Sequence, residues 1–224
     1  MKNKNYVIGL TAVIVIFGIF TIRMVSKKIG NNSVVDDDRH RVAAEEYVEM
    51  KRMGKVPNFS FTDQNGKTIT NEDYKGKVYV IEFFFTTCPS ICPIMNRNMV
   101  RVQDEFVTKD NFGIASFTID PEHDTPEVLL EYAKKHKVTN PDWHFLTGDR
   151  NEIYTLANKG LMIYAGEGSA ANGGFEHSGQ FLIVDKEGYV ICRVVNGNPV
   201  YGYDGTNNKE VENLITDIGI ELRK

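Results

Sequence analysis

The chain has 224 residues, of which 42% are hydrophobic and 25% are charged, so it is long enough for one packed domain with an appendage. Its formal net charge is −4 and its lysines and arginines are scattered, which argues against nucleic-acid binding because that function needs a basic face. Its three cysteines are too few for a framework of disulfide bonds.

The first 25 residues predict a membrane anchor. Residues 6–22 carry no charge and are rich in apolar side chains, and basic residues flank them on both sides, as in a short membrane-spanning helix. The alternatives are a cleaved signal peptide, for which no small-x-small cleavage site follows, and a buried soluble helix. Basic residues flank both ends of this segment, so the charge rule barely decides which end of the anchor faces the cytoplasm. A long soluble domain after such an anchor is usually exported, so we expect a single-pass anchor with the domain on the outer, periplasmic or extracytoplasmic, side.

Residues 26–55 are polar and charged, and we expect a spacer there, with a short helix near residues 41–52. The globular domain is expected to span residues 56–224. It opens with two alternating segments on either side of the turn-forming residues 63–66, a pattern that predicts a β-hairpin.

Strands and helices then alternate along the domain. Residues 78–85 are nearly all apolar or aromatic, apart from Glu82, and are typical of a buried central strand. Further strands are expected at 114–119, 143–146, 181–184 and 189–194, a glycine-rich loop at 166–174, and helices at 94–107, 124–136, 151–158 and 210–222. With a cysteine pair at a strand-to-helix junction, this order predicts an α/β fold, a thioredoxin-like sandwich with an N-terminal hairpin, preceded by one transmembrane helix.

Cys88 and Cys92 lie where the central strand ends and the next helix begins. The amino end of a helix presents unpaired N–H groups and the positive end of the helix dipole, which favour a thiolate over a thiol. The thiolate is the form that attacks disulfides or binds a metal. Residues four apart lie on one face of a helix, so both sulfur atoms can face one point. Two thiolates suit Cu(I) or zinc.

A third ligand is needed to complete such a site, and the chain has five histidines. We expect His40 to be solvated in the spacer, and His136 and His144 to be surface or capping groups. His123 lies in a loop that could approach the cysteines. His177 is the stronger candidate because it ends the glycine-rich loop immediately before a strand, and in a thioredoxin-like sheet this loop faces the active-site helix. An ordinary loop histidine is the alternative at this point.

The residues around these candidates give further indications. Thioredoxins place a cis-proline just before that strand, whereas residues 176–180 contain no proline and carry a side chain that can bind a metal. Cys192 is expected to be a buried, inert thiol, because free cysteine packs well in cores. Met95 and Met99 are four apart on the helix after the cysteines and are expected to face the core.

Three motifs in this order resemble the Sco/SenC family. They are Thr86-Thr87-Cys88-Pro89-Ser90-Ile91-Cys92-Pro93, Asp120-Pro121-x-x-Asp124-Thr125-Pro126, and His177 before Phe181-Leu182-Ile183-Val184-Asp185-x-x-Gly188. The resemblance covers residue 56 to the C-terminus. Two positions depart from the family pattern, since His123 replaces a common arginine and Glu176 a frequent aspartate. Either change could alter how the groups around a metal support it.

The resemblance implies a thioredoxin-like fold that binds one copper ion through Cys88, Cys92 and His177. It implies a role in assembling the binuclear copper centre of cytochrome c oxidase, with a copper-accepting oxidase subunit and a copper donor protein as partners. It also implies a location in the mitochondrial inner membrane or on the outer face of a bacterial cytoplasmic membrane, which agrees with the expected N-terminal anchor.

Two functions fit these residues. A copper metallochaperone, which is not an enzyme, would hold copper at a three-ligand site that is open to a partner. A membrane-anchored thiol–disulfide reductase would instead reduce cysteines of the oxidase copper site or of another partner, and would end with a Cys88–Cys92 disulfide. A peroxiredoxin is disfavoured, because Ile81 and Phe85 stand where its Pro-x-x-x-Thr-x-x-Cys motif needs proline and threonine.

Overall fold

The computed structural model describes residues 48–169 and 173–224, so the anchor predicted over residues 1–25 and His40 lie outside the described residues. Within the described part, no helix is both long and apolar enough to cross a membrane. The strands are β1 (Met50–Lys55), β2 (Ser60–Asp63), β3 (Thr68–Thr70), β4 (Val78–Phe84), β5 (Phe112–Thr118), β6 (Trp143–Thr147), β7 (Ala165–Glu167), β8 (Phe175–His177), β9 (Gln180–Val184), β10 (Tyr189–Val195), β11 (Asn198–Val200) and β12 (Tyr203–Asp204). The helices are the 3-10 helix η1 (Asn71–Tyr74), α2 (Cys92–Phe106), α3 (Pro126–Lys135), α4 (Arg150–Thr155), the π-helical turn η2 (Leu156–Gly160) and α5 (Asn208–Arg223).

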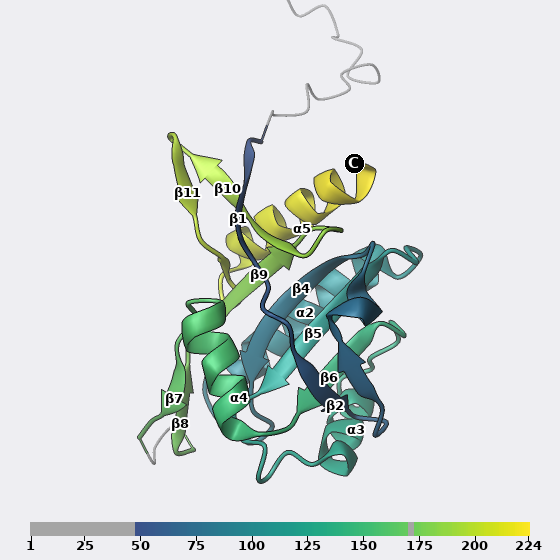
Figure 1. The fold of residues 1–224 in the computed structure, drawn as a ribbon, viewed down its shortest axis with the longest axis vertical. Coiled ribbons are helices and arrows are strands. Elements are labelled where there is room, and N and C mark those ends of the chain that lie inside the picture. Colours follow the sequence, from purple (N-terminus) through teal and green to yellow (C-terminus); the bar gives the residue numbers. More distant parts are fainter. Residues whose placement is uncertain (1–47, 170–172) are drawn as a thin grey trace, which may run out of the picture. The chain divides into compact units, whose positions relative to one another are not determined.

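The centre of the fold is a thioredoxin-like core in one mixed sheet (Figure 1). Its strand order is β5-β4-β9-β10, in which β4 and β5 are parallel, β9 is antiparallel to β4, and β10 is antiparallel to β9. Helix α2 connects β4 to β5, and α5 follows the β9–β10 pair. The sheet continues through β6, β2 and β3 beyond β5, and through β1 beyond β10. The predicted α/β fold and its hairpin, now β2–β3, are confirmed.

Strand β4 is buried along its whole length because helices and loops cover both faces of the sheet. Figure 1 shows α2 behind the sheet and α4 in front of it. On one face Phe84 stacks on Tyr132 of α3, with ring centroids 5.5 Å apart. On the other face Phe83 stacks on Phe117 of β5 at 5.4 Å. Aromatic side chains therefore fill the core on both sides of the strand that leads to the cysteines.

Strand β1 lies within residues that the sequence assigned to a polar spacer. It pairs antiparallel with β10. Its Arg52 side chain binds Asp185 at 2.6 Å and Glu187 at 2.8 Å. The short helix expected near residues 41–52 is wrong in its described part, because residues 50–52 belong to this strand. Charged side chains suggested a solvated segment, but they also suit a strand at the edge of a sheet, where they face water.

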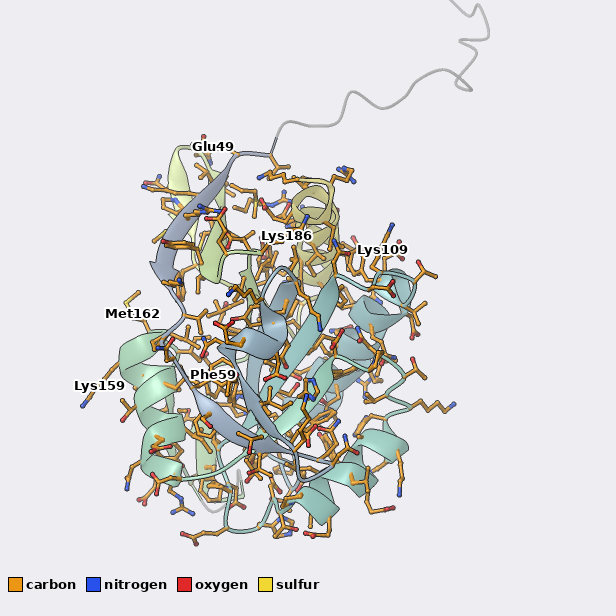
Figure 2. The ribbon with its side chains drawn as sticks, turned by 45° about the vertical axis from the view of Figure 1, so that its right-hand side comes forward. Glu49, Phe59, Lys109, Lys159, Met162 and Lys186 are labelled. Carbon is orange, nitrogen blue, oxygen red and sulfur yellow. The ribbon has the colours of Figure 1, made fainter. Side chains whose placement is uncertain are left out.

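The other predicted elements are present, with limits that differ by a few residues. The glycine-rich loop predicted over residues 166–174 is present in its described part, apart from residues 166–167, which belong to β7; β8 begins just after the loop, at Phe175. These strands form a two-stranded sheet of their own. Figure 2 shows Phe59 pointing into the domain, whereas Lys159 and Met162, beside the start of this segment, point outward.

Candidate metal centre

The two cysteines lie on the loop that leaves β4 and on the first turn of α2. The backbone N–H of Cys88 donates to the carbonyl of Phe85 at 3.3 Å, which folds the loop back on the strand end. Cys92 is the first residue of α2, and no side chain caps that end of the helix. The helix N–H groups and dipole are therefore available to the sulfur atoms, as predicted. The Cys88 side chain reaches the surface slightly, at 9% exposure, and Cys92 is 1% exposed.

His177 ends strand β8 and points at the cysteines. Its Nδ1 atom lies 3.0 Å from the carbonyl oxygen of Ser178, so Nδ1–H donates there and the other ring nitrogen, Nε2, faces the sulfur atoms. That Nε2 atom lies 3.2 Å from the Sγ atom of Cys92. The hairpin that carries His177 is fixed by Asn158, whose side chain bonds both the N–H and the carbonyl of Ala165, the register partner of His177.

Aromatic rings form one wall of the site. The ring of Phe85 meets the imidazole of His177 edge-on at 6.0 Å, and Phe175 packs against Phe85 at 5.5 Å. Gly173 allows this packing, because a Cβ atom there would lie 3.0 Å from the Phe85 ring and its backbone has a φ of +80°. An apolar wall keeps water away from the donor atoms and strengthens electrostatic interactions among them.

The donor atoms of Cys88, Cys92 and His177 all lie within 4.8 Å of one another. Donors on a single ion are at most about 4.6 Å apart, twice the length of a typical zinc–sulfur bond, so a small contraction brings all three onto one metal. Two sulfur atoms and one imidazole nitrogen form a soft donor set. The residues predicted as ligands from the sequence are therefore brought together, and the set fits a thiophilic metal.

The two thiols differ in acidity. The hydrogen bond from the Cys92 thiol, together with bonds from His177 and from backbone N–H groups, lowers the pKa of Cys88 well below its ordinary value. The neighbouring Cys88 sulfur and burial raise the pKa of Cys92. Cys88 is therefore the more acidic thiol of the pair, and Cys92 the less acidic.

Asp124 holds the cysteine loop in place from the motif that follows β5. Its buried carboxylate accepts hydrogen bonds from the backbone N–H of Thr86 at 3.1 Å, from the Thr86 hydroxyl, and from the Thr118 hydroxyl at 2.5 Å. Thr86 is two residues before Cys88, so the aspartate fixes the start of the loop. His123 lies beside this carboxylate, with its Nδ1 atom 2.9 Å from Asp124, and is not among the clustered donors.

The remaining candidates have structural roles. Cys192, Met95 and Met99 are buried, as predicted. His136 caps the carboxyl end of α3, as predicted. The prediction of a surface or capping group at His144 is wrong: its side chain is buried in β6 and its Nδ1 atom lies 3.0 Å from Asp63, which is 81 positions away in the chain.

Glu82, on the strand that leads to the cysteines, is a residue for which the sequence patterns predicted no role. It interrupts the apolar run of β4, yet it is fully buried. Its Oε1 atom accepts a hydrogen bond from Ser116 at 2.7 Å, and its Oε2 atom has no hydrogen-bond partner. A charged residue inside an otherwise continuous apolar strand was the signal that could have singled it out.

Known proteins resemble this chain over most of its length. A family model described as SCO1/SenC matches residues 49–200. The SCO1 protein homolog of Bacillus subtilis (strain 168) is 30% identical over 168 residues, which cover 73% of this chain and 81% of that protein.

Solved structures give the same likeness. BsSco, described as a member of the Sco family of cytochrome c oxidase assembly proteins with a disulfide switch, is 29% identical with a TM-score of 0.63; the match covers 75% of this chain and 93% of that one. Bradyrhizobium japonicum ScoI with copper bound is 24% identical with a TM-score of 0.60, covers 75% and 99% of the two chains, and supports the fold.

Proposed function

Because the chain belongs to the SCO1/SenC family, we propose that it is a copper metallochaperone that binds one copper ion through Cys88, Cys92 and His177. The observation that carries the proposal is the meeting of three soft donor atoms within 4.8 Å, with Nε2 of His177 only 3.2 Å from Sγ of Cys92. The copper ion is cargo in this proposal, and the chain supplies the ligands that hold and release it.

Thiolate and imidazole ligands suit both copper and zinc, and three-ligand sites with two cysteines and one histidine also occur with catalytic zinc. The choice of copper therefore rests on membership of the SCO1/SenC family. Among the described residues, the cluster offers three donors. A three-donor site leaves one side of the ion open, and an incoming ligand can attack there without first displacing a protein ligand.

We propose cytochrome c oxidase as the destination of the copper. The acceptor would be the oxidase subunit that carries the binuclear copper centre, and a separate copper donor protein would load the site. Membrane attachment through residues 1–25 and a location outside the cytoplasm stay predictions from the sequence; fractionation of cells with antibodies to this chain tests both.

Metal analysis of the purified full-length chain tests the ligand set. The reduced protein is loaded with Cu(I), excess metal is removed with a weak Cu(I) chelator, and bound copper is measured. We expect one copper per chain in the parent and in the control Cys192→Ser, and loss of copper in Cys88→Ser, Cys92→Ser and His177→Ala. Copper retained by all three ligand variants would contradict the proposal.

The unequal acidity of the two thiols supports a second candidate, a thiol–disulfide reductase. The Cys88 thiolate would attack a partner disulfide and release one partner thiolate, and Cys92, after losing its proton, would displace the other. The two electrons gained by the partner come from the Cys88–Cys92 dithiol, which ends as a disulfide. Oxidase assembly in cells separates the candidates: if His177→Ala abolishes copper retention but the oxidase copper centre still forms, the chaperone is the wrong assignment.

A further inference from the structure

Directly after His177, the chain passes beside the start of α2. The imidazole donates through Nδ1–H to the carbonyl oxygen of Ser178 at 3.0 Å. One residue further on, Gly179 lies against Ile91, the residue before Cys92: a Cβ atom on Gly179 would be 3.6 Å from the end of the Ile91 side chain. The position of the imidazole relative to Cys92 therefore depends on how firmly this short segment is held beside the helix.

The backbone of Gly205 holds this segment. The N–H of Gly205 donates to the carbonyl of Gly179 at 2.7 Å, and this bond continues the antiparallel pairing of β12 with β9 toward His177. The close approach needs a glycine at position 205, because a Cβ atom there would lie 2.5 Å from the ring of Phe181. Gly205 is thus the point at which the His177 segment is attached to the rest of the domain on its carboxyl side.

Asn98 connects Gly205 to the helix that begins with Cys92. Its side chain is buried, at 5% exposure, and its Nδ2 atom donates to the carbonyl oxygen of Gly205 at 2.8 Å. Its Oδ1 atom accepts a hydrogen bond from the guanidinium of Arg101 at 3.1 Å. These partners fix the orientation of the amide, because a guanidinium only donates and a carbonyl only accepts. A continuous path of hydrogen bonds therefore runs from α2 through Gly205 to Gly179.

We propose that Asn98 is a positioning residue that holds the His177 segment beside the start of α2 and so sets the affinity of the site for Cu(I). Without the Asn98 amide, the carbonyl of Gly205 loses its buried donor, and the bond between Gly205 and Gly179 is no longer supported from the helix. The imidazole can then move away from the sulfur atoms, and a metal is held less tightly when its ligands are not oriented. The effect on affinity rests on the proposed function, whereas the attachment of the segment does not.

Hydrogen exchange in the metal-free, full-length protein tests the attachment. In Asn98→Ala we expect the amide N–H of Gly205 to exchange about tenfold faster than in the parent, relative to the amides of β4. The matched control is Asn96→Ala, which makes the same chemical change on the same helix. Asn96 is also buried, but it contacts the hydroxyl of Tyr132 on α3. Its loss should leave the exchange of Gly205 within about twofold of the parent.

Copper binding tests the consequence. Competition with a Cu(I) chelator should show an affinity about tenfold lower in Asn98→Ala and unchanged within about twofold in Asn96→Ala. Asn98→Asp keeps the size of the side chain and its contact with Arg101 but replaces the donor with an oxygen atom, so it should show the same loss if the alanine variant folds poorly. X-ray absorption of the Cu(I)-loaded proteins reports the imidazole directly, and the copper–nitrogen signal should weaken in the Asn98 variants alone.

The outcomes separate this proposal from the proposed function. Unchanged exchange at Gly205 in both Asn98 variants, or equal effects in Asn96→Ala, would overturn the role of Asn98. Faster exchange with an unchanged affinity and copper–nitrogen signal would overturn it too, because the segment would then not control the site. A parent chain that binds no copper would remove the chaperone, and the exchange at Gly205 would still decide whether Asn98 holds the segment.

Discussion

The Nε2 atom of His177 lies 3.2 Å from the Sγ atom of Cys92, although 85 positions separate the two residues in the chain. One belongs to the start of α2 and the other to the end of β8, so the contact exists only when the strand, the helix and the later hairpin have all assembled. The three donor atoms are therefore brought together only in the folded domain. In that folded state, the cysteine thiols should differ in their reactivity.

Alkylation should distinguish the three cysteines. Because hydrogen bonds lower the pKa of Cys88 and burial raises that of Cys192, we expect iodoacetamide at about pH 6.5 to modify Cys88 at least about tenfold faster than Cys92 or Cys192 in the native, metal-free protein. Peptide mass spectrometry of quenched samples measures the rates. In urea all three should react alike, and similar rates in the native protein would contradict the greater acidity of Cys88.

Glu82 should make folding less favourable at high pH. Burial raises its pKa from 4.5 to about 7 in the folded chain, so its contribution to stability is fully present below pH 4.5 and is lost as the pH rises through 7. The loss by pH 9 is about 3 kcal/mol for a shift of this size. Urea unfolding of the parent and of Glu82→Gln at pH 5 and pH 9 isolates this effect, because other groups cancel in the comparison. The same pH dependence in both proteins would exclude it.

Asp217 should be important for stability far from the metal centre. Its carboxylate is fully buried and accepts two hydrogen bonds of 2.8 Å from Arg193 and one of 2.6 Å from the hydroxyl of Tyr203. Asp217→Ala removes the buried carboxylate together with its ion pair to Arg193 and the hydrogen bond from Tyr203, so we expect a loss of about 3–5 kcal/mol in the free energy of unfolding.

The surface pair Glu131–Lys134 is the matched control for Asp217. Both side chains are largely exposed, and their charged atoms are 2.8 Å apart. Glu131→Ala should lower the free energy of unfolding by less than about 1 kcal/mol. Urea unfolding at neutral pH measures the free energy of unfolding of both variants. Similar losses would contradict the prediction that the buried Asp217 contacts stabilise the fold more than the exposed pair does.

Asp124 should affect metal binding through the position of the cysteine loop. Asp124→Ala removes the acceptor for Thr86 and Thr118, so we expect the Cu(I) affinity to fall about 10- to 100-fold, as is usual when a group that orients metal ligands is removed. Competition with a Cu(I) chelator measures the affinity, and circular dichroism checks the fold.

Thr125 is the matched control, since it neighbours Asp124 and caps the amino end of α3. Thr125→Ala should lower stability by about 1 kcal/mol and leave the Cu(I) affinity unchanged. Equal losses of affinity in the two variants would mean that any disturbance of this loop weakens the site, and Asp124 would have no special role.

Local patterns predicted most of the fold and the two cysteines of the candidate site. The alternation of strands and helices and the chemistry of a helix start are properties of short segments, so they identify β4, α2 and the pair Cys88 and Cys92 from the sequence alone. His177 could be preferred only through the expected topology and the family resemblance. Its contact with Cys92 is now a geometric fact.

The errors concern residues whose partners are distant in sequence. The local sequence around His144 predicts a surface residue, but in the fold its side chain is buried and contacts Asp63 on β2. The residues of β1 have the composition of a spacer, and they form a strand because they pair with β10. Glu82 was visible as an interruption of an apolar run, but only the tertiary structure shows that its carboxyl group accepts a hydrogen bond from Ser116 on β5. Single-sequence patterns do not encode such pairings.

The residues of the candidate metal centre belong to two different sheets, because β7 and β8 form a sheet of their own. Cys88 and Cys92 are attached to the main sheet through β4, while His177 belongs to a hairpin that shares no ladder with that sheet in the described residues. A force on the hairpin, such as a partner pressing against it, can draw the imidazole away without breaking a backbone bond of the main sheet. In the proposed site, such a movement of the imidazole would leave the two sulfur ligands attached to the main sheet.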